Sequence, residues 1–228
     1  MNSEEYDAVI VAKDEPHLSE VVYDLQNQTL KPKRIICVVA GTQQKIDGVE
    51  WIKQTITHGP ALARNIGISV AESSIIAGFD ADIRIPEWYM EKAIRLLKES
   101  RSNIISGSNY VKDGNLLDKF NYHLLSLFSR FLDKCNQSSI IGNNYVGYRT
   151  DLLEVPFRID MNMIEDADLS RRFRKRGKTV RFFREIYVYT TPRRIYRTGG
   201  WWRYLILYFK AYKEYRKTGS VKGIKYFE

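Results

Sequence analysis

The sequence of 228 residues lacks the features of a secreted or membrane-spanning protein. It has only two cysteines, Cys37 and Cys135, which excludes a disulfide framework and favours free thiols in a reducing compartment. The acidic, polar N-terminus predicts no secretory leader. No apolar run approaches the ~20 residues that a spanning helix needs. We therefore expect a cytoplasmic protein, and the 44% hydrophobic content is enough for one substantial core.

Excess positive charge is almost absent from the body of the chain and is concentrated at its end. Residues 193–228 hold +8 of the net charge of +9. Such asymmetry predicts contact with a polyanionic surface, either lipid headgroups or nucleic acid.

Apolar runs rich in Val and Ile alternate with helical patterns along the first hundred residues. Strands are predicted at 7–12, 34–39, 48–56 and 74–79, and helices at 14–25 (with Asp14 as N-cap), 59–71 and 86–97. This alternation is typical of a parallel sheet covered on both faces. Further on, strands are predicted at 103–110, 140–148 and 179–189, and helices at 117–132 and from 165 to a stop at Gly177. No linker separates the halves, so we expect one continuous sheet. The Phe/Leu stripe of residues 120–131 is interpreted as core.

Two acidic clusters carry the chemistry: Asp80-Ala81-Asp82 and Glu165-Asp166-Ala167-Asp168. The first follows a buried strand, and ligands of open α/β sheets bind at the carboxyl ends of strands. A carboxylate pair there can hold a hard divalent cation, and a separate carboxylate can accept a proton. A metal and a base together can move a group off a diphosphate. The simpler alternatives are that the first cluster caps a turn and that the second complements a helix dipole.

Four segments, taken in order, resemble the family 2 glycosyltransferases with the GT-A fold: residues 8–15, 59–67, 80–82 (the D-x-D motif) and 165–169 (the E-D motif). The resemblance implies an α/β, Rossmann-like, mostly parallel central sheet flanked by helices, with a mixed C-terminal half. It implies a transferase domain over residues 1–198. Residues 1–102 would bind the nucleotide-sugar and 103–198 the acceptor, followed by a basic, aromatic helix and tail at 199–228.

The resemblance also implies roles for individual residues. Asp82 would ligate Mn²⁺ or Mg²⁺, and Asp80 would contact the ribose or a metal-bound water. Asp166 would be the catalytic base, which inverts the anomeric configuration. Donor contacts are expected from Ala12, Lys13, Glu15, Arg64, Asp80, Arg193 and Arg194, and acceptor contacts from Glu165, Asn143 and Asn144. For Arg64 an ion pair with an acid is the alternative, and for the two asparagines it is ordinary hydrogen bonding at a strand end.

Two positions depart from the family pattern. The usual Asp after the second strand is absent from residues 39–42, Val-Ala-Gly-Thr, so recognition of the base is altered. All three histidines precede the E-D motif, and Arg193-Arg194 stand where many members have a late histidine. These arginines would neutralise the diphosphate directly.

We therefore expect an inverting, metal-dependent glycosyltransferase. It would move a sugar from a nucleotide-diphospho-sugar, UDP-linked before GDP-linked, to a glycan, lipid-linked or protein acceptor. One rival is a nucleotidyltransferase acting on a sugar phosphate, but the Gly-rich loop that it needs after the first strand is missing. The other is a basic nucleic-acid-binding module, which would leave the acidic clusters without a purpose.

Two alternative contacts are expected for the C-terminal helix. Trp201, Leu205, Tyr208, Tyr212 and Tyr215 form a stripe, with Arg203, Lys210 and Lys217 opposite. The helix either lies peripherally on an anionic membrane face or packs on the protein's own core.

Overall fold

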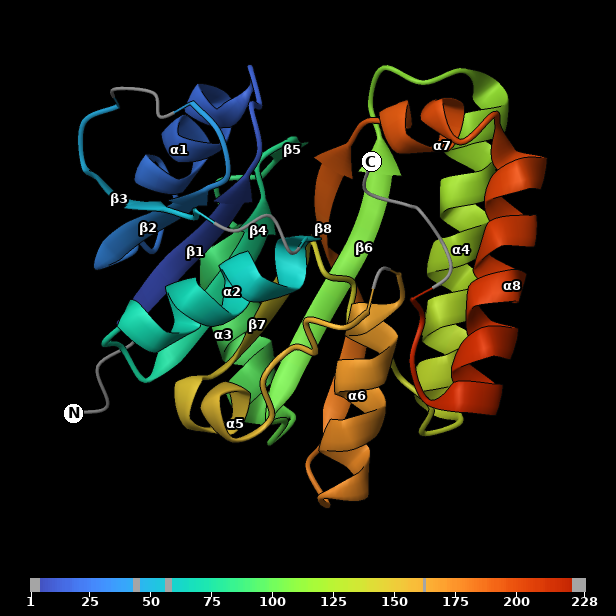
Figure 1. Cartoon of the computed structure of the whole chain (residues 1–228). Helices are drawn as coiled ribbons and strands as arrows, with labels where there is room; N and C mark the ends of the chain where they lie inside the picture. The colour runs from blue at the N-terminus through green and yellow to red at the C-terminus, as the bar shows by residue number, and fades with distance from the viewer. Residues whose placement is uncertain (1–4, 43–45, 56–58, 162, 223–228) are drawn as a thin grey trace.

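A computed structural model describes residues 5–42, 46–55, 59–161 and 163–222. One eight-stranded mixed sheet runs through the molecule (Figure 1). The strands are β1 (Tyr6–Ala12), β2 (Arg34–Val39), β3 (Val49–Lys53), β4 (Ile75–Asp80), β5 (Ile83–Arg84), β6 (Ile104–Val111), β7 (Asn144–Tyr148) and β8 (Val180–Thr190). Their spatial order is β3-β2-β1-β4-β7-β6-β8-β5, so the two halves share a single sheet, as the absence of a linker predicted.

The first four strands are parallel and have cores on both faces. Helices α1 (Leu18–Gln26) and α3 (Tyr89–Glu99) cover one face and α2 (Gly59–Val70) covers the other. Successive residues of β1 enter opposite cores, which is why the strand is apolar throughout. Gly67 lets α2 approach closely, because a Cβ there would lie 2.3 Å from Val9 Cγ1.

The start of α1 differs from the prediction. The helix begins at Leu18 with His17 at its N-cap, so the assignment of Asp14 as N-cap is wrong. Asp14 has a positive φ of 46°. Its Oδ1 accepts a hydrogen bond from the Thr42 backbone N–H at 2.9 Å. The side chain therefore ties the loop after β1 to the loop after β2.

In the second half, β7 lies antiparallel between β4 and β6, and β8 is parallel to β6. Helices α5 (Arg149–Glu154) and α6 (Glu165–Lys175) connect these strands. Gly177 has a φ of 73° just beyond α6, as expected of a glycine that ends a helix. The strand predicted at 140–148 is shorter and begins at Asn144.

A separate pair of helices, α4 (Leu116–Lys134) and α8 (Trp201–Thr218), runs side by side at one end of the molecule, joined to β8 through α7 (Arg193–Arg197) (Figure 1). The interpretation of the α4 stripe as core is wrong, because Phe120, Leu124, Leu127 and Phe131 are 59%, 44%, 41% and 60% exposed. The buried side of α4 is polar. Ser126 Oγ shares a hydrogen bond of 2.7 Å with Ser108 Oγ of β6. The apolar side of α4 therefore points away from the sheet.

Asp118 joins the first turn of α4 to α7 and α8. It is 1% exposed and forms a capping box with Asn115. Its carboxylate accepts hydrogen bonds from Trp201 Nε1 at 2.8 Å and from the Tyr196 hydroxyl at 2.7 Å. The ring centroids of Tyr122 and Trp201 lie 5.4 Å apart. One buried carboxylate thus holds three helices together.

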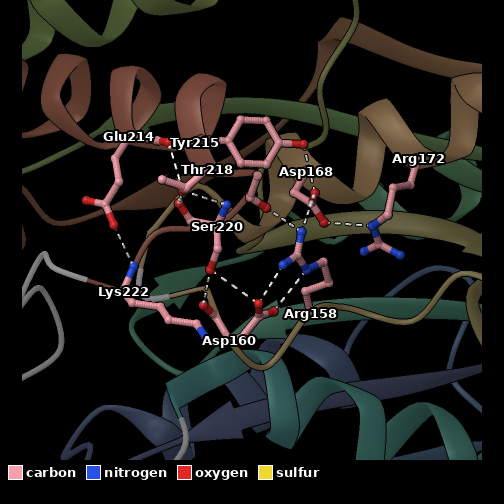
Figure 2. Close-up of polar contacts among 10 residues, drawn as sticks. Arg158, Asp160, Asp168, Arg172, Glu214, Tyr215, Thr218, Ser220 and Lys222 are labelled. Carbon is pink, nitrogen blue, oxygen red and sulfur yellow. Dashed lines mark hydrogen bonds and ion pairs between the residues drawn. The ribbon is translucent and has the colours of Figure 1, made fainter.

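The far end of α8 is fixed to α6 by the polar network of Figure 2. The Tyr215 hydroxyl donates to Asp168 Oδ1 at 2.8 Å, and Arg172 Nε donates to Asp168 Oδ2 at 2.7 Å. Ser220 Oγ donates to Asp160, the ion-pair partner of Arg158. A small apolar cluster accompanies this network and comprises Met161, Met163, Ile164, Ala211, Tyr215 and Val221. Part of the C-terminal stripe thus packs on the protein, while residues 223–228 of the predicted tail lie outside the described part.

Candidate functional site

A pocket of about 260 Å³ lies where the two acidic motifs meet. Asp80 is the last residue of β4, Asp82 follows it, and Glu165 and Asp166 form the first turn of α6. All four line the pocket, although the motifs are more than 80 residues apart in the sequence. The other walls include Arg64, Asn109, Tyr122, Leu125, Ser126, Ser129, Ile141, Gly142, Asn143, Thr190, Thr191, Arg194, Ile195 and Tyr204.

Arg64 of α2 connects the two motifs. Its Nη2 lies 2.9 Å from Asp80 Oδ1 and its Nη1 lies 2.8 Å from Glu165 Oε1. The Arg64 side chain is only 4% exposed, and its guanidinium lies over the ring of Phe157. Burial alone would lower the pKa of Arg64, but Asp80 and Glu165 raise it above its ordinary value. The geometry therefore favours the ion-pair interpretation of Arg64, which sets the separation of the two acidic motifs.

Asp166 is held by two backbone donors. Its Oδ1 accepts from the Ala167 N–H at 2.8 Å and its Oδ2 from the Gly142 N–H at 3.2 Å. Burial, followed by the negative charge of Glu165, raises the pKa of Asp166 to about 6. A carboxylate with this pKa is ionised at neutral pH and close to the value that suits a general base.

The residue before this helix turn has an unusual backbone conformation. Ile164, at the N-cap of α6, has a φ of 60° and a ψ of 25°, in the left-handed region. Such a conformation is uncommon for a β-branched residue. The side chain of Ile164 is 5% exposed and packs in the cluster that includes Ala211 and Tyr215 of α8.

Asp82 forms a direct ion pair with an arginine beside the pocket. Its Oδ2 lies 3.1 Å from Arg193 Nη2, and Arg193 also forms an ion pair with Glu15. Burial and the neighbouring Asp80 raise the pKa of Asp82, and Arg194 and Arg193 offset only part of this rise. The charged form of Asp82 is therefore disfavoured in the folded protein.

This donor set is suited to a cation that is shared with a substrate. Within the described residues, no group of three or more His, Cys, Asp or Glu side chains is placed to hold a metal ion by itself. Mg²⁺ typically takes one or two carboxylates and completes its coordination with phosphate oxygens and water. Asp82, with Asp80 beside it, fits that pattern, since Asp80 is oriented by Arg64.

Of the five remaining residues predicted to contact the donor, one lines this pocket and four do not. Arg194 lines it, whereas Glu15 is buried and paired with Arg193. Ala12 is half-buried at the end of β1. Lys13 is exposed in the following loop and does not line the pocket.

The two asparagines predicted to contact the acceptor have different surroundings in the structure. Asn143 lines the pocket. Asn144 is fully buried, and its Oδ1 accepts from the Gly107 N–H at 2.7 Å while its Nδ2 donates to Asn109 Oδ1 at 2.7 Å. Its amide is satisfied within the sheet, so the structure favours the strand-end interpretation for Asn144 and leaves Asn143 as the acceptor candidate.

Sequence reasoning missed the contribution of α4 and α8 to the pocket. Tyr122, Ser126 and Ser129 of α4 and Tyr204 of α8 line it. The signal was present, because the α4 residues recur at spacings of four and three on the side opposite the Phe/Leu stripe.

Comparison with known proteins gives one family and several similar structures. A family model described as "Glycosyl transferase family 2" matches residues 7–174. TarS of S. aureus aligns over 92% of this chain and 40% of its own, with a TM-score of 0.64 and 13% identity. The mannosyltransferase PcManGT of Pyrobaculum calidifontis, in complex with GDP-Man and Mn²⁺, aligns over 85% of this chain and 60% of its own, with a TM-score of 0.62 and 16% identity.

The chain thus spans less than two thirds of the length of these structures. At such identities the likeness is one of fold. None of the curated proteins is similar enough in sequence to match.

Proposed function

The chain belongs to glycosyl transferase family 2 and has the GT-A fold, and from this membership we propose that it moves a sugar from a nucleotide-diphospho-sugar to an acceptor hydroxyl with inversion. The observation that carries the proposal is that Asp82 and Asp166 line one pocket. Arg64 forms ion pairs with Asp80, two residues before Asp82, and with Glu165, next to Asp166.

Asp166 is proposed to take the proton of the acceptor hydroxyl. The acceptor oxygen then forms a bond to the anomeric carbon as the bond from that carbon to the diphosphate oxygen breaks, and the nucleoside diphosphate leaves. Attack from the face opposite the leaving group inverts the anomeric configuration. General-base assistance of this kind is typically worth ~10²–10⁴ in rate.

The leaving diphosphate gathers negative charge that the site must neutralise. A divalent cation, Mn²⁺ or Mg²⁺, held by Asp82 with Asp80 beside it, would supply Lewis-acid stabilisation of this charge. Arg194 on the pocket wall and Arg193 beside Asp82 are proposed to contact the phosphate oxygens, as guanidinium groups commonly do. Glu15 would hold Arg193 in place through their ion pair.

The site constrains the nucleotide base of the donor and the identity of the acceptor less than it constrains the reaction. We expect a UDP-sugar and keep a GDP-sugar as the alternative, which the GDP-Man bound to the P. calidifontis mannosyltransferase favours. The acceptor would be a glycan, lipid-linked or protein hydroxyl placed near Asn143 and Glu165. We propose a cytoplasmic enzyme, because Cys37 and Cys135 are both free thiols.

Nucleotide binding and turnover test the proposal separately. Thermal unfolding is measured with UDP, GDP or dTDP, each with Mn²⁺, with Mg²⁺ and with EDTA. Release of the nucleoside diphosphate from candidate donors is then measured with the best ligand. We expect metal-dependent stabilisation by one nucleoside diphosphate; stabilisation by none of them, or by polynucleotide alone, would contradict it.

Two variants assign the roles of the carboxylates. Asp82→Asn should lose the metal-dependent part of the stabilisation. Asp166→Asn should keep that part and lose turnover. Asp113→Asn, in an exposed loop, is the matched control and should behave like the wild type. Full turnover in either site variant would exclude the role assigned to that carboxylate.

A further inference from the structure

The outer side of α4 and α8 carries most of the exposed apolar surface of the described chain. Fourteen of the nineteen exposed large apolar side chains among the described residues lie on these two helices. We name this the α4–α8 face, and its apolar members are Leu116, Leu117, Phe120, Leu124, Leu125, Leu127, Phe128, Phe131, Trp202, Leu205, Ile206, Tyr208, Phe209 and Tyr212. So many exposed apolar side chains on two neighbouring helices mark an interaction site, since scattered apolar residues would need no explanation.

The polarity of α4 is reversed with respect to an ordinary surface helix. Its buried residues are Asp118 and Ser126, whereas Leu116 is 85% and Phe128 is 56% exposed. A helix that faced water would place these residues the other way round. The reversed polarity predicts an apolar environment on the outer side of α4.

The acidic side chains of the two helices are buried or paired, whereas the exposed ionic side chains are basic. Asp118 is buried, Asp133 is paired with Arg181, and Glu214 accepts a hydrogen bond from the Lys222 N–H. The exposed ionic side chains of these helices are all basic: Lys119, Arg130, Lys134, Arg203, Lys210, Lys213, Arg216 and Lys217. The α4–α8 face therefore combines aliphatic and aromatic side chains with charge of a single sign.

We propose that the α4–α8 face docks on an anionic lipid bilayer, with both helices lying in the plane of the headgroups. Leu, Phe and Trp side chains would enter the acyl boundary, and the Lys and Arg side chains would contact anionic headgroups. Within the described chain no helix is long and apolar enough to cross a membrane, so the contact would be interfacial. A second copy of the chain fits less well, because it would bring two basic faces together. Nucleic acid would leave the aliphatic side chains without a partner.

Docking would leave the helices anchored to the body. Asp118 holds the start of α8 and Asp168 holds its end. Tyr122 and Leu125 of α4 and Tyr204 of α8 also line the pocket. A bilayer bound to the α4–α8 face would therefore lie next to the pocket wall.

Vesicle flotation tests the proposal with the full chain and needs no substrate, so its outcome is separate from that of the transfer reaction. Vesicles of phosphatidylcholine alone are compared with vesicles that also contain phosphatidylglycerol, at low and high salt. We expect flotation with the anionic vesicles that weakens at high salt.

Two double variants on the face have a matched control on another face. Lys210→Ala with Lys213→Ala should lower partitioning roughly thirtyfold, because each base near an anionic surface contributes about a factor of five. Phe128→Ala with Phe209→Ala should lower it at both salt concentrations. Tyr23→Ala with Lys31→Ala changes an exposed aromatic residue and an exposed base near α1 and should have no effect. Thermal unfolding checks that every variant is folded.

Three outcomes would overturn the proposal. The first is a folded wild type that does not float with anionic vesicles. The second is equal partitioning of the face variants and the control. The third is a dimer in light scattering that Phe128→Ala with Phe209→Ala dissociates, without any vesicle binding, which would assign the face to a second copy.

Discussion

Replacing Asp166 by asparagine should stabilise the folded protein at neutral pH. The pKa of Asp166 is about 6 in the folded protein, because of burial and the charge of Glu165, against an ordinary value of 3.8. The folded state therefore disfavours the ionised carboxylate. At 1.36 kcal/mol per pH unit, this reduces the free energy of unfolding by about 3 kcal/mol at neutral pH. Asparagine removes that cost but has one acceptor oxygen for two backbone donors, which returns about 1 kcal/mol.

The pH dependence of this gain identifies its cause. Well below the ordinary pKa of 3.8 both the folded and the unfolded states carry the proton and the cost is absent; the cost grows as the pH rises toward about 6 and is constant above that value. The gain in the free energy of unfolding on Asp166→Asn should therefore be about 2 kcal/mol larger at about pH 7.5 than at about pH 4.5.

Urea denaturation of the wild type and Asp166→Asn at several pH values measures this difference. Asp113→Asn replaces an exposed carboxylate and should show no such trend. A difference between wild type and Asp166→Asn that does not change with pH would refute the raised pKa. Loss of turnover in the same variant, together with an acid limb near pH 6 in the kcat/KM of the wild type, would assign the titration to the reaction.

Substitutions at three further buried positions test the contacts described above. Arg64→Met should reduce the free energy of unfolding by about 3–5 kcal/mol, because it leaves Asp80 and Glu165 without their buried partner. Arg64→Lys should reduce the free energy of unfolding less. If urea denaturation showed no change for Arg64→Met, the two ion pairs of Arg64 would not be structurally important. Tyr145→Phe should raise the free energy of unfolding by about 1 kcal/mol, because the buried Tyr145 hydroxyl has no hydrogen-bond partner within the described chain. A loss of stability in this variant would show that the hydroxyl has a partner. Asp118→Ala should speed amide hydrogen exchange in residues 193–210, and unchanged exchange there would show that α7 and α8 do not depend on this carboxylate.

Features with a local cause were predictable from the sequence. Val and Ile runs mark β1, β2 and β4 because these strands are buried on both faces, and Asp80 ends a strand in the sequence as in the structure. The order of the four motifs predicted the family and the GT-A fold, and both are confirmed. The roles of the individual site residues remain proposals.

Features that depend on contacts between distant segments were not predictable. The bond between Arg64 and Glu165 joins residues 101 positions apart, and no local pattern indicates it. Periodicity in α4 showed which residues share a side, but it does not say whether that side meets the protein or the surroundings. The pattern therefore predicts Phe120 and Phe131 in the core, although both are exposed.

The left-handed conformation of Ile164 links the C-terminal helix to the geometry of Asp166. Holding a residue in a sparsely populated backbone region costs about 1–3 kcal/mol, and the surroundings must impose it. Here the surroundings include Ala211 and Tyr215 of α8, which pack with the Ile164 side chain. Without the contacts of α8, nothing in this cluster would hold Ile164 in the left-handed conformation, and we expect the first turn of α6, which carries Asp166, to relax. The geometry of the proposed base and the packing of the last helix are therefore coupled, and we expect a truncation that removes α8 to lower turnover although Asp166 itself is unchanged.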